Sequence, residues 1–209
     1  MLPRTTGLIF MISGADLRRL VLVLCLLFTC APAAHAEDWG LAALMQSLSQ
    51  TRSASAGFTE RQTSPVLSAP LISTGTLTYA APFYLRKTTI SPTPEDFVLD
   101  HDKITLTSSQ AGGTRVFTAN QDPRIAGLVE GIRGTLAGDL PALETFFNVS
   151  LSGNVTNWQL QLLPKTAALA RFLRSITING HQNDIDIIDT AGADGGDSRM
   201  SIRPITDAP

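Results

Sequence analysis

The sequence predicts an α+β fold, in which one large antiparallel sheet curls and carries its helices on one side. Three observations support this fold class. Apolar residues alternate with a period of two over most of the chain after residue 56, short turn-forming segments join these stretches, and helical spacing is confined to one N-terminal segment and one central block. Strands joined by short links pair as antiparallel neighbours. A sheet this long curls, so helices across its open side would enclose a space.

The first 36 residues have the form of a cleavable export signal. Arg4, Arg18 and Arg19 precede an apolar run from Leu20 to Phe28, and the segment ends in a small-x-small sequence at 34–36. The apolar run is too short to cross a bilayer as a helix. We therefore expect cleavage after residue 36 and an exported chain without a membrane-spanning helix.

The exported chain, residues 37–209, has the length of one domain with a sizeable core. Either Met1 or Met11 can be the translation start. Cys25 and Cys30 both lie in the signal, so disulfides cannot stabilise the exported protein. The formal net charge of the whole chain is −2, and no basic cluster is present. These properties argue against nucleic acid as a partner.

The exported chain begins with a predicted amphipathic helix, in which Leu41, Leu44, Met45 and Leu48 recur at helical spacing. The strand period follows. The first group of predicted strands comprises the surroundings of Phe58 and residues 71–79, 83–90, 96–99, 104–107 and 115–118.

Helical spacing returns in the centre of the chain. Residues 125–136 form one apolar stripe that ends near Gly138, and Asp139 is placed to cap a second short helix carrying Leu143, Phe146 and Phe147. Strands are then expected at 149–151 and 158–162, a short helical piece at 167–173, and strands at 175–178, 185–188 and 199–202. We expect the SGN segment, 152–154, to be the turn between the first two of these strands.

The segment LTYAAPFYLRK, residues 77–87, raises the question of function. Leu77, Tyr79, Phe83 and Leu85 share one face of an extended chain, and this pattern then breaks at two basic residues. Such a face either packs in an ordinary core or lines a cavity.

Several segments, in order and spacing, resemble the family of periplasmic outer-membrane lipoprotein carrier proteins, LolA and its relatives. These segments are SASAGFTERQ (53–62), GTLTYAAPFYLRK (75–87), EDFVLDHDKITL (95–106), WQLQLLPK (158–165) and RMSI (199–202). IRGTLAGDLPALETFF (132–147), NWQL (157–160) and DGGDSRM (194–200) are similar to a LolA-related branch linked to polyene-lipid gene clusters.

The resemblance implies an open half-barrel covered by short lid helices over a hydrophobic cavity. It further implies a monomeric, non-enzymatic carrier in the periplasm, without a cofactor or metal. Such a carrier takes an acylated lipoprotein or lipid from an inner-membrane donor and shields its acyl chains on the way to an outer-membrane acceptor. The alternative is a structural or interaction module of the cell envelope with the same fold and a filled core.

On this reading, the cavity is formed by apolar residues of the strands and of the lid. The expected wall residues are Leu77, Tyr79, Phe83, Leu85, Phe97 and Leu99, and the expected lid residues are Ile125, Leu128, Val129, Ile132, Phe146 and Phe147.

Two positions depart from the family pattern. A basic residue that is thought to hold the lid shut is replaced by Ala81, and an aromatic residue farther along is replaced by Lys87. Arg86 and Lys87 are the possible polar contacts. The side chain of Arg86 should lie on the face opposite to Leu85, whereas Lys87 should place an ammonium on the cavity face. That charge favours a lipid with an anionic or polar end over a lipoprotein.

Other polar residues are weaker candidates for chemistry. Asp184, Asp186, Asp189, Asp194 and Asp197 lack the spacing of a calcium loop and suit hairpin turns, so no metal site is expected. His101 and His181 lie in predicted turns, and the sequence has no G-x-S-x-G motif. We therefore do not expect an enzyme.

Overall fold

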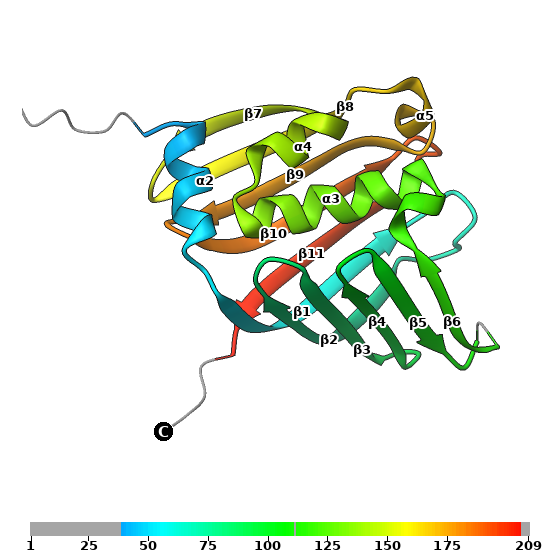
Figure 1. The fold of residues 1–209 in the computed structure, drawn as a ribbon. Helices are drawn as coiled ribbons and strands as arrows, with labels where there is room; N and C mark the ends of the chain where they lie inside the picture. The colour runs from blue at the N-terminus through cyan, green and yellow to red at the C-terminus, as the bar shows by residue number, and fades with distance from the viewer. Residues whose placement is uncertain (1–38, 111, 206–209) are drawn as a thin grey trace, which may run out of the picture. The chain divides into compact units, whose positions relative to one another are not determined.

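The computed structural model describes residues 39–110 and 112–205, which form one sheet with its helices (Figure 1). The predicted export signal, residues 1–36, lies outside the described part. Eleven strands pair in the order β6-β5-β4-β3-β2-β1-β11-β10-β9-β8-β7. Every pairing is antiparallel, and β6 and β7 are the two free edges of the sheet. The prediction of a single open antiparallel sheet with helices is confirmed.

The strands follow the predicted order along the chain. They are β1 (Ser53–Thr63), β2 (Leu71–Ala80), β3 (Tyr84–Ser91), β4 (Glu95–Asp100), β5 (Lys103–Ser108), β6 (Gly113–Thr118), β7 (Phe147–Asn154), β8 (Asn157–Pro164), β9 (Leu173–His181), β10 (Asp184–Gly192) and β11 (Asp197–Pro204). The last strand, β11, pairs with the first, β1, so these two strands lie at the centre of the sheet.

The helices of the described part are α2 (Leu41–Ser49), the 3-10 turn η1 (Ala119–Gln121), α3 (Pro123–Ala137), α4 (Leu140–Phe146) and α5 (Ala167–Ala170). α4 begins as predicted, because an oxygen of the Asp139 side chain accepts a hydrogen bond from the Ala142 N–H at 3.1 Å. None of the described helices is long and apolar enough to cross a membrane.

Three details differ from the sequence prediction. Phe147 opens β7 and does not belong to the helix before it. The turn between β7 and β8 is formed by residues 155 and 156, because residues 152–154 still pair with β8. The predicted helical piece at 167–173 ends at Ala170, and Leu173 already opens β9. In each case strand pairing extends beyond the alternating apolar residues that are visible in the sequence.

The helices pack on the sheet through a main core. It contains twelve buried residues of the described part: Leu44, Met45, Leu48, Leu143, Phe147, Trp158, Leu160, Leu162, Leu169, Leu173, Ile176 and Ile178. These residues come from α2, α4, α5 and strands β7, β8 and β9. The same helices lie in front of this half of the sheet in Figure 1.

Helix α3 approaches this core closely through glycines. A Cβ atom added at Gly131 would lie 2.8 Å from the end of the Ile176 side chain. Gly138, just after α3, has φ 64°, and a Cβ atom there would lie 2.0 Å from the carbonyl oxygen of Met45 in α2. Glycine is therefore needed at the point where the two helices meet.

Candidate functional site

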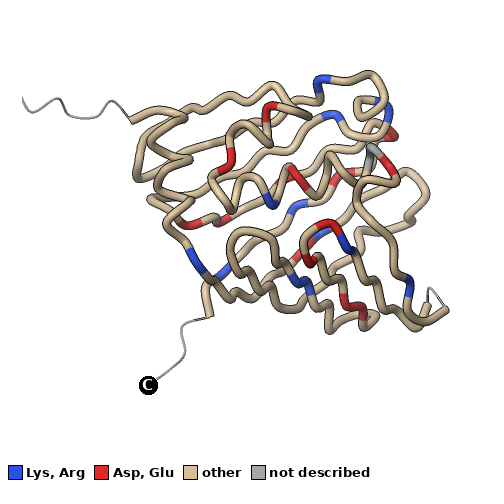
Figure 2. Tube along the Cα trace, in the orientation of Figure 1, with Lys and Arg blue, Asp and Glu red and all other residues tan. Residues whose placement is uncertain are grey.

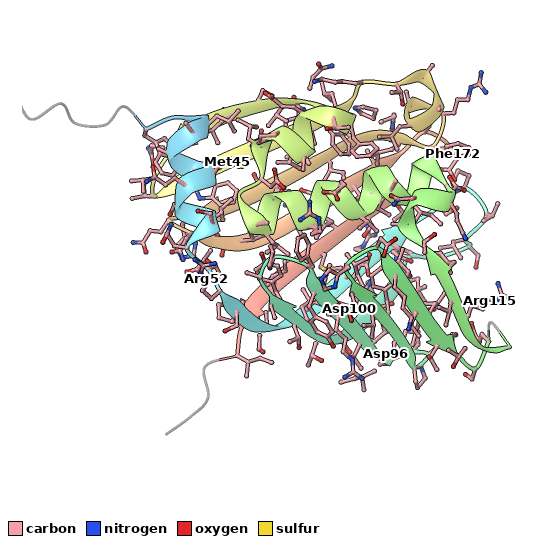
Figure 3. The ribbon with its side chains drawn as sticks, viewed as in Figure 1. Met45, Arg52, Asp96, Asp100, Arg115 and Phe172 are labelled. Atoms are coloured by element: carbon pink, nitrogen blue, oxygen red, sulfur yellow. The ribbon has the colours of Figure 1, made fainter. Side chains whose placement is uncertain are left out.

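The concave face of β2–β6 presents apolar side chains to α3. Strand register places Tyr79, Leu85, Leu99, Ile104 and Phe117 side by side on five consecutive strands. Leu99 and Ile104 are fully buried. In Figure 3, Asp100 marks the end of β4 that lies towards α3, and Asp96 marks the other end. The apolar row therefore lies at the end of the strands nearest the helix.

A small second core joins this row to the helix. Its buried members in the described part are Leu99, Ile104 and Ala119, and Ile125 and Val129 of α3 pack against them. Leu85, Phe97 and Phe117 complete the contact from the sheet. This half of the fold thus has far fewer buried side chains than the half beneath β7–β10.

A cleft of about 340 Å³ lies beside the second core, where α3 and α4 meet the turns at the ends of β2 and β4. Its lining residues are Phe83, His101, Asp102, Ala119, Asn120, Ala126, Val129, Glu130, Arg133 and Phe146. The lining combines apolar side chains with a charged rim.

The structure distributes the predicted wall and lid residues over several environments. Phe83, Val129 and Phe146 line the cleft. Leu85, Phe97, Leu99 and Ile125 belong to the second core or pack against it, whereas Ile132 and Phe147 belong to the main core. Leu77 is partly buried on the same face as Tyr79, and Leu128 is 45% exposed.

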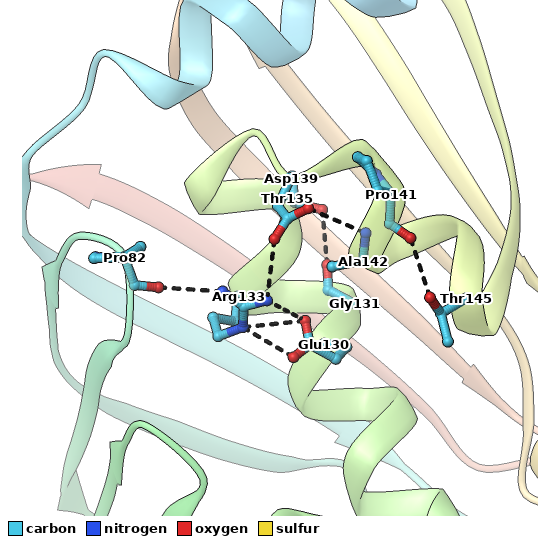
Figure 4. Close-up of polar contacts among 9 residues, drawn as sticks. All are labelled: Pro82, Glu130, Gly131, Arg133, Thr135, Asp139, Pro141, Ala142 and Thr145. Carbon is cyan, nitrogen blue, oxygen red and sulfur yellow. Dashed lines mark hydrogen bonds and ion pairs between the residues drawn. The ribbon is translucent and has the colours of Figure 1, made fainter.

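The sequence reasoning missed Arg133, which joins α3 to the turn before β3 (Figure 4). Its Nη1 donates to the carbonyl oxygen of Pro82 at 3.3 Å. Its Nη2 and Nε donate to the Glu130 carboxylate at 2.6 and 3.0 Å, and an Asp139 oxygen lies 3.5 Å from Nη2. The guanidinium also lies 5.7 Å from the centre of the Phe83 ring. One side chain therefore connects the helix to both residues that follow Ala81.

Arg133 remains charged although it is only 7% exposed. Burial lowers its pKa, but the carboxylates of Glu130 and Asp139 more than offset this effect and raise the pKa above its ordinary value. A signal was present in the sequence. Arg133 follows Val129 by four residues and so lies on the same helical face, beside the apolar stripe.

The two basic residues singled out in β3 point to opposite faces, as predicted. Arg86 lies on the convex face, where its Nε donates to Asp96 at 2.8 Å. Lys87 lies on the concave face, paired with Leu77 and Phe97, and its Nζ donates to Glu60 at 2.5 Å. Both bind strand residues, and the contact between helix and turn is made by Arg133.

One buried polar atom of the concave face has no partner in the described part of the chain. The Tyr79 hydroxyl is buried without a hydrogen bond, in a residue that is 4% exposed. Burial raises the pKa of Tyr79, and the nearby Arg133 and Arg52 only partly oppose this effect. The hydroxyl is therefore a neutral hydrogen-bonding group.

The histidines and the C-terminal aspartates are occupied by each other and by arginines. His101 Nδ1 lies 2.8 Å from Asp100, and the His101 ring stacks on Phe83. His181 Nδ1 lies 2.8 Å from Asp186, and Asp184 is 3.9 Å from the other ring nitrogen. The three other aspartates are also engaged: Asp189 faces Arg199, Asp194 accepts from the Gly196 N–H, and Asp197 pairs with Arg174.

An open, curled antiparallel sheet with helices across one face and a partly apolar cleft between them defines a binding and carrier fold. The cleft and the second core are its candidate binding region. The chain belongs to the family of proteins like the outer membrane lipoprotein carrier protein LolA, whose family model matches residues 31–203. A comparison with curated proteins finds no match.

Solved structures of low sequence identity are similar to this fold. A LolA superfamily protein from Nitrosomonas europaea has 9% identity and a TM-score of 0.42, with 81% of this chain and 95% of that chain covered. A putative outer membrane lipoprotein-sorting protein domain from Vibrio parahaemolyticus has 10% identity and a TM-score of 0.43, with 81% and 94% covered. The MucA/MucB complex of Pseudomonas aeruginosa has 10% identity and a TM-score of 0.41, with 80% and 57% covered.

Proposed function

We propose that the protein is a non-enzymatic carrier that shields acyl chains of a lipoprotein or lipid between the concave face of β2–β6 and α3. The observation that carries this proposal is the cleft of about 340 Å³, with Phe83, Val129 and Phe146 in its lining, next to the small second core. Membership of the LolA-like family supports the same function.

The physical need for a carrier follows from the cost of exposing hydrocarbon to water. Each exposed methylene costs about 0.8 kcal/mol, so a long acyl chain carries roughly 10 kcal/mol. Ligand pockets typically enclose about 300–1,000 Å³, so a cleft of about 340 Å³ accepts a short segment of chain. More room requires the second core to separate, and only three of the described residues are buried in it.

Two polar features are consistent with an interior that opens and fills. The buried Tyr79 hydroxyl has no partner in the described part, and leaving such a group unpaired costs about 1–3 kcal/mol. A bound molecule with an oxygen atom would relieve this cost. Arg133 holds α3 to the turn at Pro82, in the region where Ala81 replaces the family's basic residue.

In this proposal the carrier works in the periplasm, after export directed by residues 1–36. It receives cargo from an inner-membrane donor and delivers it to an outer-membrane acceptor. A mixed surface fits release to a partner without a strong single-sign field, because basic and acidic residues are interspersed along the chain in Figure 2.

The test is to purify the exported chain, extract it with organic solvent and identify acylated species by mass spectrometry. Ala126→Trp places a large side chain in the cleft, because Ala126 lines it and is 8% exposed. This variant should lose the bound acyl species while keeping the circular dichroism spectrum of the wild type. Leu128→Trp is the matched control on the exposed side of the same helix. Clean extracts from the wild type at high yield would instead favour the envelope module with a filled core.

A further inference from the structure

The concave face changes from apolar to polar along the strands. The apolar row of Tyr79, Leu85 and Leu99 lies at the end nearest α3. Farther from the helix, the same face carries five polar residues, which we call the polar end: Glu60, Ser73, Lys87, Thr89 and Ser108. Glu60, Ser73, Thr89 and Ser108 are each no more than 8% exposed. Buried polar groups on one side of an apolar hollow need a physical reason.

Glu60 is already saturated with hydrogen bonds. Its Oε1 accepts from Gln62 Nε2 at 3.1 Å and from Ser198 Oγ at 2.5 Å, and its Oε2 accepts from Lys87 Nζ at 2.5 Å. Burial raises its pKa, but Lys87 and the two other donors outweigh burial and lower the pKa below its ordinary value. Glu60 is therefore a carboxylate with little capacity for another donor.

Lys87 is the under-used member of the pair. An ammonium has three N–H donors, and the described residues supply one acceptor, Glu60. The Lys87 side chain is 28% exposed, whereas the Glu60 side chain is 7% exposed. Nζ also lies 5.0 Å from the centre of the Phe58 ring, which keeps the cation over the concave face. The ammonium is thus the group of this pair that can reach a ligand.

The hydroxyl groups of the polar end add further donors. Within the described part of the chain, the side chains of Ser73, Thr89 and Ser108 make no hydrogen bond to another residue. The polar end therefore offers one ammonium and three hydroxyls. The other charged side chains placed on this face by strand register are Glu95 and Arg115, which are both exposed and of opposite sign.

We propose that the polar end is a headgroup site for an acyl-chain ligand whose head carries anionic oxygens, a carboxylate or a phosphate. This inference rests on the proposed carrier function. Lys87 binds the anionic oxygen, and the hydrocarbon tail runs along the concave face towards the cleft. Phe83, at the cleft, precedes Lys87 by four residues, about 13 Å at a strand rise of about 3.3 Å per residue. When Lys87 turns to the ligand, Gln62 and Ser198 still satisfy Glu60.

The experiment compares ligands of one chain length that differ only in the head. Calorimetry on the delipidated exported chain would measure a fatty acid, its methyl ester, the alkyl phosphate and the alkyl trimethylammonium salt. The wild type should bind the carboxylate or the phosphate about tenfold more tightly than the ester, as expected for one charge-assisted hydrogen bond. Comparing the two anions identifies which head is preferred, and tighter binding of the trimethylammonium salt would overturn the proposal.

Lys87→Met should reduce the affinity for the anion to that for the ester and leave the ester unchanged. Because this variant leaves Glu60 without its counter-charge, the double variant Glu60→Gln/Lys87→Met provides a neutral site if the single variant fails to fold. Arg86→Met is the matched control, because Arg86 is adjacent in sequence but pairs with Asp96 on the opposite face.

The two proposals fail in different ways. If no ligand, including the ester, binds the wild type, the carrier function itself is refuted. If the ester and the anions bind equally well, or if the neutral double variant keeps the preference for anions, carriage stands and the headgroup site is wrong.

Discussion

Replacing Arg133 by Met should increase the opening of the cleft, because this side chain connects α3 to the turn at Pro82. The lost contacts are one charged hydrogen bond to a backbone carbonyl at 3.3 Å and a guanidinium over the Phe83 ring at 5.7 Å. The hydrogen bond is long, so we assign it the lower end of its usual range, about 1.5 kcal/mol. The ring contact adds about 0.5 kcal/mol. Together, about 2 kcal/mol corresponds to roughly a thirtyfold larger open population.

Hydrogen exchange under native conditions measures this opening residue by residue. The His101 N–H donates to the Phe83 carbonyl oxygen at 3.1 Å and so reports on the turns that border the cleft. In Arg133→Met this amide should exchange roughly thirtyfold faster, while amides of β8 and β9 beneath the main core should change much less. A fluorescent apolar probe should also enter the variant faster than the wild type.

Arg174→Met is the control for the loss of an arginine, because Arg174 pairs with Asp197 at an exposed site outside the cleft lining. It should leave the exchange of the His101 amide unchanged. If Arg133→Met accelerates exchange equally in both halves of the sheet, Arg133 only stabilises the whole fold. If exchange at His101 does not change at all, Arg133 does not hold the turn.

Two further predictions concern stability. The pKa of Glu60 is lowered in the folded protein, so its stabilising contribution is complete above the ordinary value of 4.5 and is lost as the pH falls through the folded pKa; melting temperatures from neutral pH to pH values below 4.5 should therefore fall less steeply in Glu60→Gln than in the wild type, and equal slopes would contradict this. Gly138→Ala should destabilise the protein by about 3 kcal/mol in denaturant titrations, because it combines a positive φ with a clash against Met45, whereas Gly112→Ala should cost only about 1 kcal/mol, since its φ is 79° and no atom lies within 4 Å of the added Cβ.

The sequence predicted the parts of the fold that depend on local periodicity. Alternation in LTYAAPFYLRK placed Arg86 and Lys87 on opposite faces, and the strand register agrees. The same alternation in SASAGFTERQ places Glu60 on the face of Phe58, so this signal was available and was not used. What the sequence could not supply is the partner of Lys87. That partner is 27 residues away, and the contact depends on the registers of two strand pairs.

The Arg133 contact illustrates the same limit more strongly. Helical spacing puts Arg133 beside Val129, but its acceptor at Pro82 lies 51 residues earlier, in a turn. Only the path of the sheet brings that turn to the helix. The conserved-looking position at Ala81 directed attention to nearby basic residues of the same strand, whereas the structure provides the charge from the opposite partner, the helix.

The two halves of the sheet imply which elements move when a ligand enters. Helix α3 meets the main core through glycine at Gly131 and is fixed to α2 at Gly138, where an added Cβ would clash with backbone. Moving α3 as a lid would therefore disturb a core with twelve buried residues in the described part. Moving the turns of β2–β3 and β4–β5 away from α3 disturbs a core with three, together with the contacts of Arg133. Since the cost of exposing apolar surface scales with its area, opening should proceed by displacement of the turns, with α3 as the fixed wall.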